Sequence, residues 1–131
     1  LSLSASRPVS ITIASIGVRL AVQELGLTPA GALAVPAPGR HYDEVGWYRA
    51  SPTPGEIGPS VLAGHVDSAT TGPSVFWKLG SLRTGARIDV RRADDTTATF
   101  TVIAPTVSAV RLALSTSLAT MAVSASGVSS V

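Results

Sequence analysis

The chain has 131 residues, of which 45% are hydrophobic and 14% charged, and its formal net charge at pH 7 is +2. This composition is typical of one globular domain with a single core and excludes a disordered chain. Arg91 and Arg92 form the only adjacent basic pair, so we expect no nucleic-acid partner. The sequence has no cysteine, which excludes disulfides, thiolate metal sites and a thiol nucleophile in this chain.

The first predicted elements are two short strands. Residues 9–18 begin with alternating apolar and polar residues, which predicts a strand with Val9, Ile11 and Ile13 on one face. Gly17 interrupts the pattern, and the residues from Leu20 to Leu25 are expected to form a second strand.

Proline and glycine recur every few residues from 29 to 59, which excludes long helices in that part of the chain. Residues 31–40 predict a short strand that ends at Pro36. An apolar run at 61–64, bounded by Pro and Gly clusters, predicts a buried strand over 60–67.

The second half of the sequence predicts one helical turn and four further strands. The turn is expected over 74–79, and the strands over 86–92, 97–102, 107–117 and 121–126. Seven or eight short strands with turn signals between them predict a mainly all-β fold. We expect a single, closed or nearly closed β-barrel of about eight strands with short helical turns, which forms one domain over residues 1–131.

The C-terminal segment, residues 103–131, has an unusual composition. It contains one charged residue, Arg111, and no aromatic residue, and 21 of its 29 residues are Ala, Ser, Thr or Val. Strands of a barrel rarely consist so uniformly of small residues. We therefore expect that this segment departs from the natural sequence, and an intact mass equal to that calculated from this sequence would contradict the expectation.

One titratable residue stands at the end of the predicted buried strand. His65 follows the apolar run, and Asp67 comes two residues later. A polar side chain at the end of a buried strand lies at the rim of the domain, so His65 is a candidate catalytic residue. A histidine that caps the strand for structural reasons is the alternative. Asp67 either orients His65 or accepts a backbone hydrogen bond near the turn, and we favour the second role.

Five stretches of the sequence together resemble the sortases of actinobacteria, in class F or the neighbouring class E. They are ITIASIGV at 11–18, ELGLTPAGALAVP at 24–36, GWYRASPTPGEIGPSVLAGHVDS at 46–68, VFWKL at 75–79 and ARIDVRRADDTTATFTV at 86–102. The third stretch is the most specific, because its Pro and Gly spacing extends over a long segment.

The resemblance implies a sortase β-barrel and a cysteine transpeptidase on the outer face of the plasma membrane, held by an N-terminal anchor outside this chain. Such enzymes cut an LPXTG-like sorting signal after its threonine and form a thioester acyl-enzyme. They then pass the protein to an amine of the peptidoglycan precursor or of a pilin lysine. The resemblance implies neither a cofactor nor a metal, and we expect a monomer.

The family uses a histidine, a cysteine and an arginine for catalysis, and His65 in AGHVD matches the histidine. A neighbouring imidazole favours the reactive thiolate and then protonates the leaving amine. An arginine near the scissile carbonyl stabilises the developing oxyanion.

The other two members of the set do not carry over. The family's cysteine ends a strand that reads roughly Leu-Arg-Leu-Ile-Thr-Cys. Alignment with residues 112–117 puts Ser117 at the cysteine position, and alignment of 110–112 with the hydrophobic-Arg-Leu step puts Ser115 there. We favour Ser117 because it keeps the threonine before the nucleophile. No arginine follows Arg111, which we interpret as structural because the family's arginine comes after the cysteine.

Three functions are therefore considered. The first is a sortase transpeptidase in an impaired form, because a serine in a site tuned for a thiolate is a poor nucleophile. The second is a non-catalytic sortase-like domain that binds a sorting signal. The third is a serine acyl-transferase or hydrolase that uses Ser117 or Ser115 with His65.

Two further groups of residues have less specific interpretations. His41, Asp43 and Glu44 are a candidate cation site, although we expect His41 to be exposed in a polar loop. The aromatic pairs at 47–48 and 76–77 are expected to pack in the core and at its rim.

Overall fold

The computed structural model describes residues 2–68, 72–102, 108–113 and 116–124. Its regular structure consists of nine strands and two short 3-10 helices: β1 (Pro8–Ile13), η1 (Ala14–Ile16), β2 (Val18–Leu25), β3 (Val45–Tyr48), β4 (Pro59–Ser68), β5 (Gly72–Pro73), η2 (Leu79–Ser81), β6 (Arg87–Arg92), β7 (Thr97–Thr101), β8 (Ser108–Ala113) and β9 (Thr116–Ser124). The fold is all-β, as the sequence predicts. Within the described ranges, no helix is long and apolar enough to cross a membrane.

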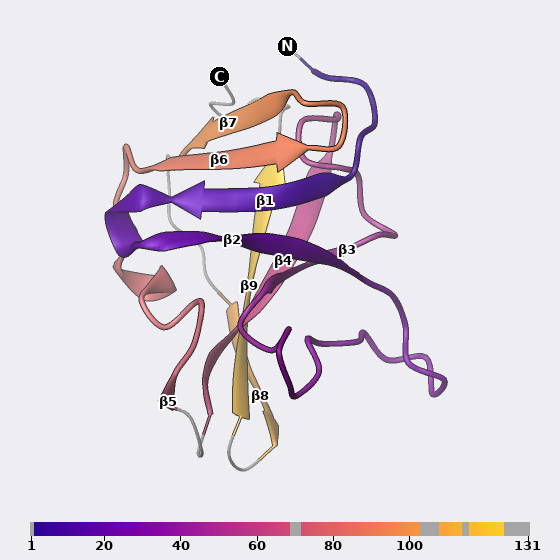
Figure 1. Ribbon diagram of the computed structural model, residues 1–131, viewed down its shortest axis with the longest axis vertical. Coiled ribbons are helices and arrows are strands. Elements are labelled where there is room, and N and C mark those ends of the chain that lie inside the picture. Colours follow the sequence, from indigo (N-terminus) through magenta and orange to yellow (C-terminus); the bar gives the residue numbers. More distant parts are fainter. Residues whose placement is uncertain (1, 69–71, 103–107, 114–115, 125–131) are drawn as a thin grey trace.

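The strands form one strongly curled sheet in the order β7-β6-β1-β2-β3-β4-β9-β8, with β5 paired to the end of β4. Neighbouring strands are antiparallel except β2 and β3, which are parallel. In Figure 1, β6, β1 and β2 run across the view, whereas β4, β9 and β8 run steeply. The two halves of the sheet enclose a core. No pairing between described residues joins β7 to β8, so the barrel-like sheet is not closed by hydrogen bonds.

The two predicted N-terminal strands are present as β1 and β2, which pair antiparallel, and the structure corrects one detail of the prediction. Ile11 and Ile13 are fully buried and belong to the main core, as the alternating pattern predicts. The same pattern places Val9 on that face, but Val9 is 37% exposed. The reason is a bulge between β1 and β6: Pro8 pairs with Arg92 and Ser10 with Arg91, so Val9 between them is the extra, unpaired residue.

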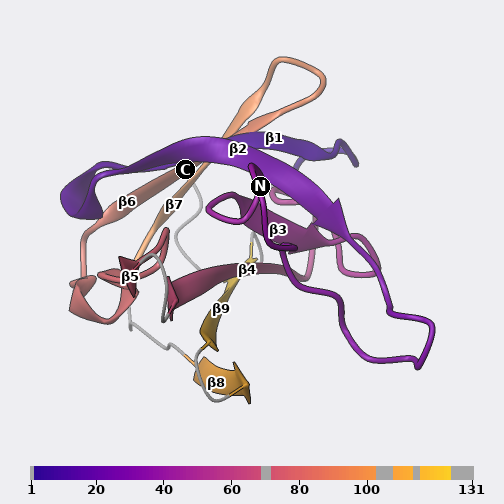
Figure 2. The ribbon, with the colours of Figure 1, turned by 60° about the horizontal axis from the view of Figure 1, so that its bottom comes forward.

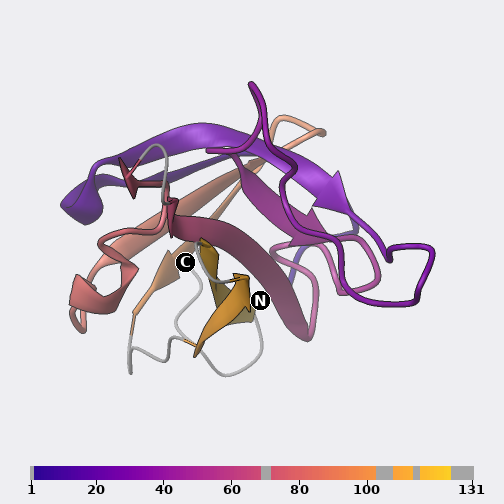
Figure 3. The same ribbon diagram turned by 90° about the horizontal axis from the view of Figure 1, so that it is seen from below.

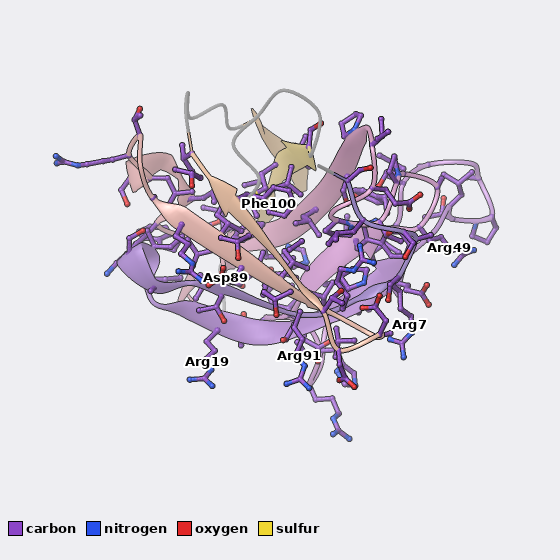
Figure 4. All side chains as sticks on the ribbon, turned by 90° about the horizontal axis from the view of Figure 1, so that it is seen from above. Arg7, Arg19, Arg49, Asp89, Arg91 and Phe100 are labelled. Carbon is purple, nitrogen blue, oxygen red and sulfur yellow. The ribbon has the colours of Figure 1, made fainter. Side chains whose placement is uncertain are left out.

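The main core lies between the two halves of the sheet. It gathers buried side chains from both halves: Ile11, Ile13, Val18, Val45, Trp47, Leu62, Phe76, Leu79, Leu82, Ile88, Val90, Ala98, Phe100, Ala119, Met121 and Val123. Figure 4 shows Phe100 among the side chains of the interior, while Arg19 and Arg91 project away from it on the outer face of the sheet. The predicted packing role is confirmed for Trp47 and Phe76, whereas Trp77 is 51% exposed at the rim.

Strand β4 separates the main core from a second, smaller one. Leu62 belongs to the main core, and Ala63, its neighbour, belongs to a cluster with Leu25 and Tyr48. Burial raises the pKa of Tyr48, whose hydroxyl donates a hydrogen bond to the carbonyl of Ala34 (2.9 Å). Both faces of β4 are therefore covered near its middle.

The second cluster is covered by the connection between β2 and β3, residues 26–44, which we call the strap. It leaves the end of β2 as a long excursion and returns to β3, as Figures 2 and 3 show. The strand predicted over 31–40 is wrong. The Thr28 amide donates to the Ala32 carbonyl and the Ala34 amide to the Gly26 carbonyl, so the chain folds back on itself there.

Most of the remaining predicted strands are confirmed within one or two residues at β4, β6 and β7. The two C-terminal predictions have the wrong bounds. The residues predicted as one strand over 107–117 divide between β8, which ends at Ala113, and β9, which begins at Thr116 and continues through the predicted gap at 118–120, because the uniformly small residues carry no local signal for the break. Strands β8 and β9 pair antiparallel. The predicted turn at 74–79 is present as a turn that continues into η2. Strand β3 has no counterpart among the predicted strands, because its four residues acquire their pairing only from β2 and β4, which are distant in sequence.

A buried arginine ties the N-terminal segment to the barrel. Arg92 is 1% exposed, and its guanidinium donates to the carbonyls of Pro54 (3.0 Å) and Ser4, and to the Asp94 carboxylate (3.3 Å). The hydroxyl and amide of Thr96 also donate to Asp94. These bonds from Thr96, together with Arg92, lower the pKa of Asp94 to about 2.

Candidate active site around His65

His65 lies near the end of β4, two residues after Ala63, which belongs to the small second cluster. Its side chain is 2% exposed. On β9, Leu118 is the partner of His65 and Ser117 is the partner of Asp67, with a register irregularity between His65 and Asp67. A bulge next to a candidate catalytic residue is a common way to redirect a side chain.

The local sequence explains how the chain reaches this position. A Cβ atom at Gly64 would lie 2.8 Å from both Phe76 Cδ2 and Val75 Cγ1, so only glycine lets the 75–76 segment pack closely on β4. The Phe76 amide in turn donates to the His65 carbonyl (3.0 Å). The backbone of His65 is therefore held by β9 on one side and by the 74–79 turn on the other.

The imidazole of His65 is held by two groups of the strap. Its Nε2 atom lies 2.8 Å from the carbonyl oxygen of Pro36. The ring of Tyr42 stacks on it, with the ring centroids 3.9 Å apart and the planes at 7°. Its Nδ1 atom is buried and has no hydrogen-bond partner among the described residues. A buried ring nitrogen with a free lone pair is the atom that can exchange a proton with a reacting group.

The strap is itself fastened at several points around this ring. The Tyr42 hydroxyl donates to the carbonyl of Asp67 (3.2 Å), and the Ser74 hydroxyl donates to the Asp43 carboxylate (2.5 Å). The side-chain amide of Gln23 donates to the carbonyl of His41 (3.0 Å). These bonds connect the strap to β2, β4 and the start of the 74–79 turn.

The other predicted site residues have different placements. The backbone of Ser117 pairs with Asp67 on one side and with Arg111 on the other, and nothing is described of the side chains of Ser117 and Arg111. Ser115 lies outside the described residues. The structure thus brings the preferred nucleophile position to the strand next to His65, while the choice between the two serines stays a prediction.

Asp67 does not orient the imidazole through a hydrogen bond, because Nε2 is bonded to Pro36 and Nδ1 has no described partner. Its main-chain carbonyl accepts the Tyr42 hydroxyl bond (3.2 Å), whereas the favoured role of the Asp67 side chain as acceptor of a backbone hydrogen bond stays a prediction.

The predicted exposure of His41 is confirmed, and the residue pairs with Glu44 (2.7 Å). Asp43 bonds to Ser74 instead of joining them. In the part of the chain that the structure describes, no group of three or more His, Cys, Asp or Glu residues is arranged to hold a metal ion.

A comparison with protein families identifies the domain. The family model for the sortase domain matches residues 11–120, which is most of the chain. The protein therefore belongs to the sortase family. Searches of curated proteins and of solved structures returned no match.

Sequence reasoning identifies His65 but not the two groups that hold its ring. It treats Pro36 only as the end of a strand, and it gives Tyr42 no role at all. The signal for Tyr42 is an aromatic residue between two polar ones in a Pro- and Gly-rich loop, which does not indicate which distant side chain it contacts.

Proposed function

We propose that this protein is a sortase transpeptidase of the class F or class E type in an impaired form, which binds an LPXTG-like sorting-signal peptide at His65. The proposal rests on one observation: a buried histidine with a free Nδ1 atom lies next to the strand that carries position 117. Membership of the sortase family supports the assignment of this histidine as the family's acid and base.

In this mechanism, a nucleophile at position 117 passes its proton to Nδ1 of His65 and attacks the carbonyl carbon of the signal's threonine. The bond from that carbon to the next residue's nitrogen breaks, and His65 gives the proton to the leaving amine. An acceptor amine then attacks the acyl-enzyme and gives a proton to His65, the new amide forms as the bond to the nucleophile breaks, and His65 returns that proton to the nucleophile. The acceptor would be a peptidoglycan precursor or a pilin lysine, and the protein would act outside the plasma membrane, where its anchor holds it.

The sequence has a serine where this step needs a thiol. A hydroxyl is hardly ionised at neutral pH, and His65 has no described carboxylate partner to support it as a strong base. We therefore expect this chain to bind the peptide with little or no turnover. The absence of cysteine also favours the second candidate function, a non-catalytic domain that recognises the sorting signal.

The experiment restores the thiol. Ser117→Cys, Ser115→Cys and the unchanged chain are incubated with an internally quenched LPXTG peptide and an amine acceptor, and binding is followed separately by fluorescence polarisation. We expect slow cleavage and transfer with Ser117→Cys, because no arginine follows Arg111 to stabilise the oxyanion. We expect none with Ser115→Cys, and loss of turnover when His65→Ala is added to Ser117→Cys. Turnover within a few fold after that addition would contradict the role of His65.

The other outcomes assign the alternatives. Peptide binding by all variants, with no cleavage by either cysteine variant, supports the binding domain and rejects the transpeptidase. Labelling of the unchanged chain by a fluorophosphonate probe supports the serine hydrolase. Neither binding nor turnover in any variant would overturn the proposed peptide substrate.

A further inference from the structure

The strap makes two kinds of contact with the His65 ring, one at the edge of the ring and one on its face. The Pro36 carbonyl meets the edge of the ring at Nε2 (2.8 Å), and the Tyr42 ring covers its face (3.9 Å, 7°). Together they restrain both the position of the ring and its rotation about the bond to Cβ. The family match does not describe either contact.

We infer that Pro36 and Tyr42 are positioning residues that hold His65 as its Nε2–H tautomer and leave Nδ1 as the nitrogen that reacts. The inference deepens the function proposed above and rests on it for its consequence in catalysis. Its structural part, the choice of tautomer, does not depend on any activity.

The Pro36 carbonyl decides the tautomer. A carbonyl oxygen only accepts hydrogen bonds, so the short contact at Nε2 is a bond only if Nε2 carries the hydrogen. In the neutral ring, Nδ1 is then the acceptor. If the ring flipped over, a carbon atom would face the Pro36 carbonyl and that bond would be lost.

Tyr42 keeps the ring from turning. Its own ring is fixed at the far end, because the hydroxyl donates to the Asp67 carbonyl (3.2 Å) on the same strand as His65. The next residue, Asp43, is bonded to Ser74 (2.5 Å). The Tyr42 ring is thus held through its own hydroxyl and through the neighbouring residue Asp43. Its face-to-face contact with the imidazole therefore leaves the imidazole little room to rotate.

This arrangement suits repeated proton transfer. When Nδ1 takes up a proton, the Nε2–H bond to Pro36 is still present, since imidazolium carries hydrogens on both nitrogens. When Nδ1 gives the proton away, the same bond remains. The ring therefore accepts and delivers a proton at one atom without changing its orientation, as general acid–base catalysis requires.

The test uses the full chain labelled with ¹⁵N-histidine and long-range ¹H–¹⁵N correlation spectra, which distinguish the two tautomers. The protein has only two histidines, and His41→Gln assigns their signals. We expect an Nε2–H to Nδ1–H ratio for His65 of at least about fivefold, the ratio that one ordinary hydrogen bond gives. An Nδ1–H tautomer, or an equal mixture, would overturn the inference.

Two substitutions at Tyr42 separate positioning from folding. Tyr42→Phe keeps the stacked ring and loses only the bond to the Asp67 carbonyl, so it should lower the tautomer ratio less than Tyr42→Leu does. Tyr42→Leu removes the ring and should lower the ratio at least about threefold, while the backbone amide spectrum outside residues 26–44 stays unchanged. An unaltered ratio in a folded Tyr42→Leu variant would show that Tyr42 does not position the histidine.

The result is distinguishable from failure of the proposed function. A dominant Nε2–H tautomer together with an inactive Ser117→Cys variant would leave the positioning intact and reject the transpeptidase. An active Ser117→Cys variant with the opposite tautomer would keep the transpeptidase and reject the positioning. In an active Ser117→Cys background, Tyr42→Leu should reduce kcat more than KM.

Discussion

Replacing Arg92 by methionine tests whether the bonds of a buried guanidinium outweigh the cost of burying its charge. The variant keeps an unbranched stem of similar reach and removes the donors. The Pro54 carbonyl is then buried without a partner, which costs about 1–3 kcal/mol. The Ser4 carbonyl, on an exposed residue, is solvated again, and its lost bond costs about 0.5–1 kcal/mol.

Two further contributions to the stability change in Arg92→Met are either smaller or stabilise the variant. The Asp94 side chain is 40% exposed, so its ion pair with Arg92 contributes about 0–1 kcal/mol. Removal of the charge also relieves its desolvation, including that of the unpartnered Nε atom. The sum is a loss of about 2–4 kcal/mol in the free energy of unfolding, because only one side of the bonded network is replaced.

The assay is equilibrium unfolding in urea, with Arg91→Met as the matched control. Arg91 is the neighbouring residue on the same strand, but its side chain is 62% exposed and its partner Asp95 is 84% exposed. The control should change stability by less than about 0.5 kcal/mol. Equal or higher stability of Arg92→Met would refute the reasoning, because it would show that desolvation exceeds the hydrogen bonds. A second readout is the Leu3 amide, which donates to the Gly55 carbonyl (2.8 Å) and should exchange faster in the variant.

Two other predictions concern pH and packing. The pKa of Asp94 is lowered to about 2 by bonds from Thr96 and Arg92, so the unfolded state binds more protons as the pH falls from about 4 to 2. Stability should fall over that window, and Asp94→Asn should flatten the fall measured by urea unfolding. Gly64→Ala should destabilise the fold by about 1–3 kcal/mol, since its Cβ would overlap Phe76 and Val75 at 2.8 Å.

Each of these predictions has a control on the same chain. Asp95→Asn removes a carboxylate whose ion pair lies at the surface, and an equal flattening of the pH profile would reject the role of Asp94. A Cβ atom at Gly80 would meet no other atom within 4 Å, so Gly80→Ala should be neutral by comparison. Equal thermal stability of the two alanine variants would show that the 75–76 segment moves away from the added Cβ atom without loss of stability.

The strands were predictable from the sequence where both strands of a hydrogen-bonded pair have a recognisable local sequence pattern. Strands β6 and β7 alternate strongly and are joined by an Asp-Asp turn in which Asp95 adopts a positive φ of 67°, so the sequence alone indicates the hairpin. Strand β3 carries no such signal, because all four of its residues are buried and its pairing depends on distant strands. The bulge that exposes Val9 depends likewise on β6.

The candidate site was predictable in its histidine and not in the groups that surround it. His65 follows from a local pattern, a polar residue at the end of an apolar run. Its ring contacts span 29 residues to Pro36 and cross from the strap to β4, and no periodicity encodes such a meeting. The false strand at 31–40 shows the same limit, because β propensity does not report that the carbonyl of Pro36 binds a histidine.

The position of His65 links catalysis to the stability of the strap. Beneath the strap, the second cluster contains only Leu25, Tyr48 and Ala63 as fully buried apolar residues, with partly buried neighbours around them. Several of the bonds that fasten the strap are exposed, such as the one from Ser74 to Asp43. Segments with few buried contacts open more readily than the core. A peptide that displaced the strap would remove both groups that align the imidazole, whereas a peptide that bound alongside it would keep Nδ1 in place. Under the proposed function, productive binding therefore requires the strap to stay closed over His65, so variants that loosen the strap in the Ser117→Cys background should lower its turnover before they lower the stability of the fold.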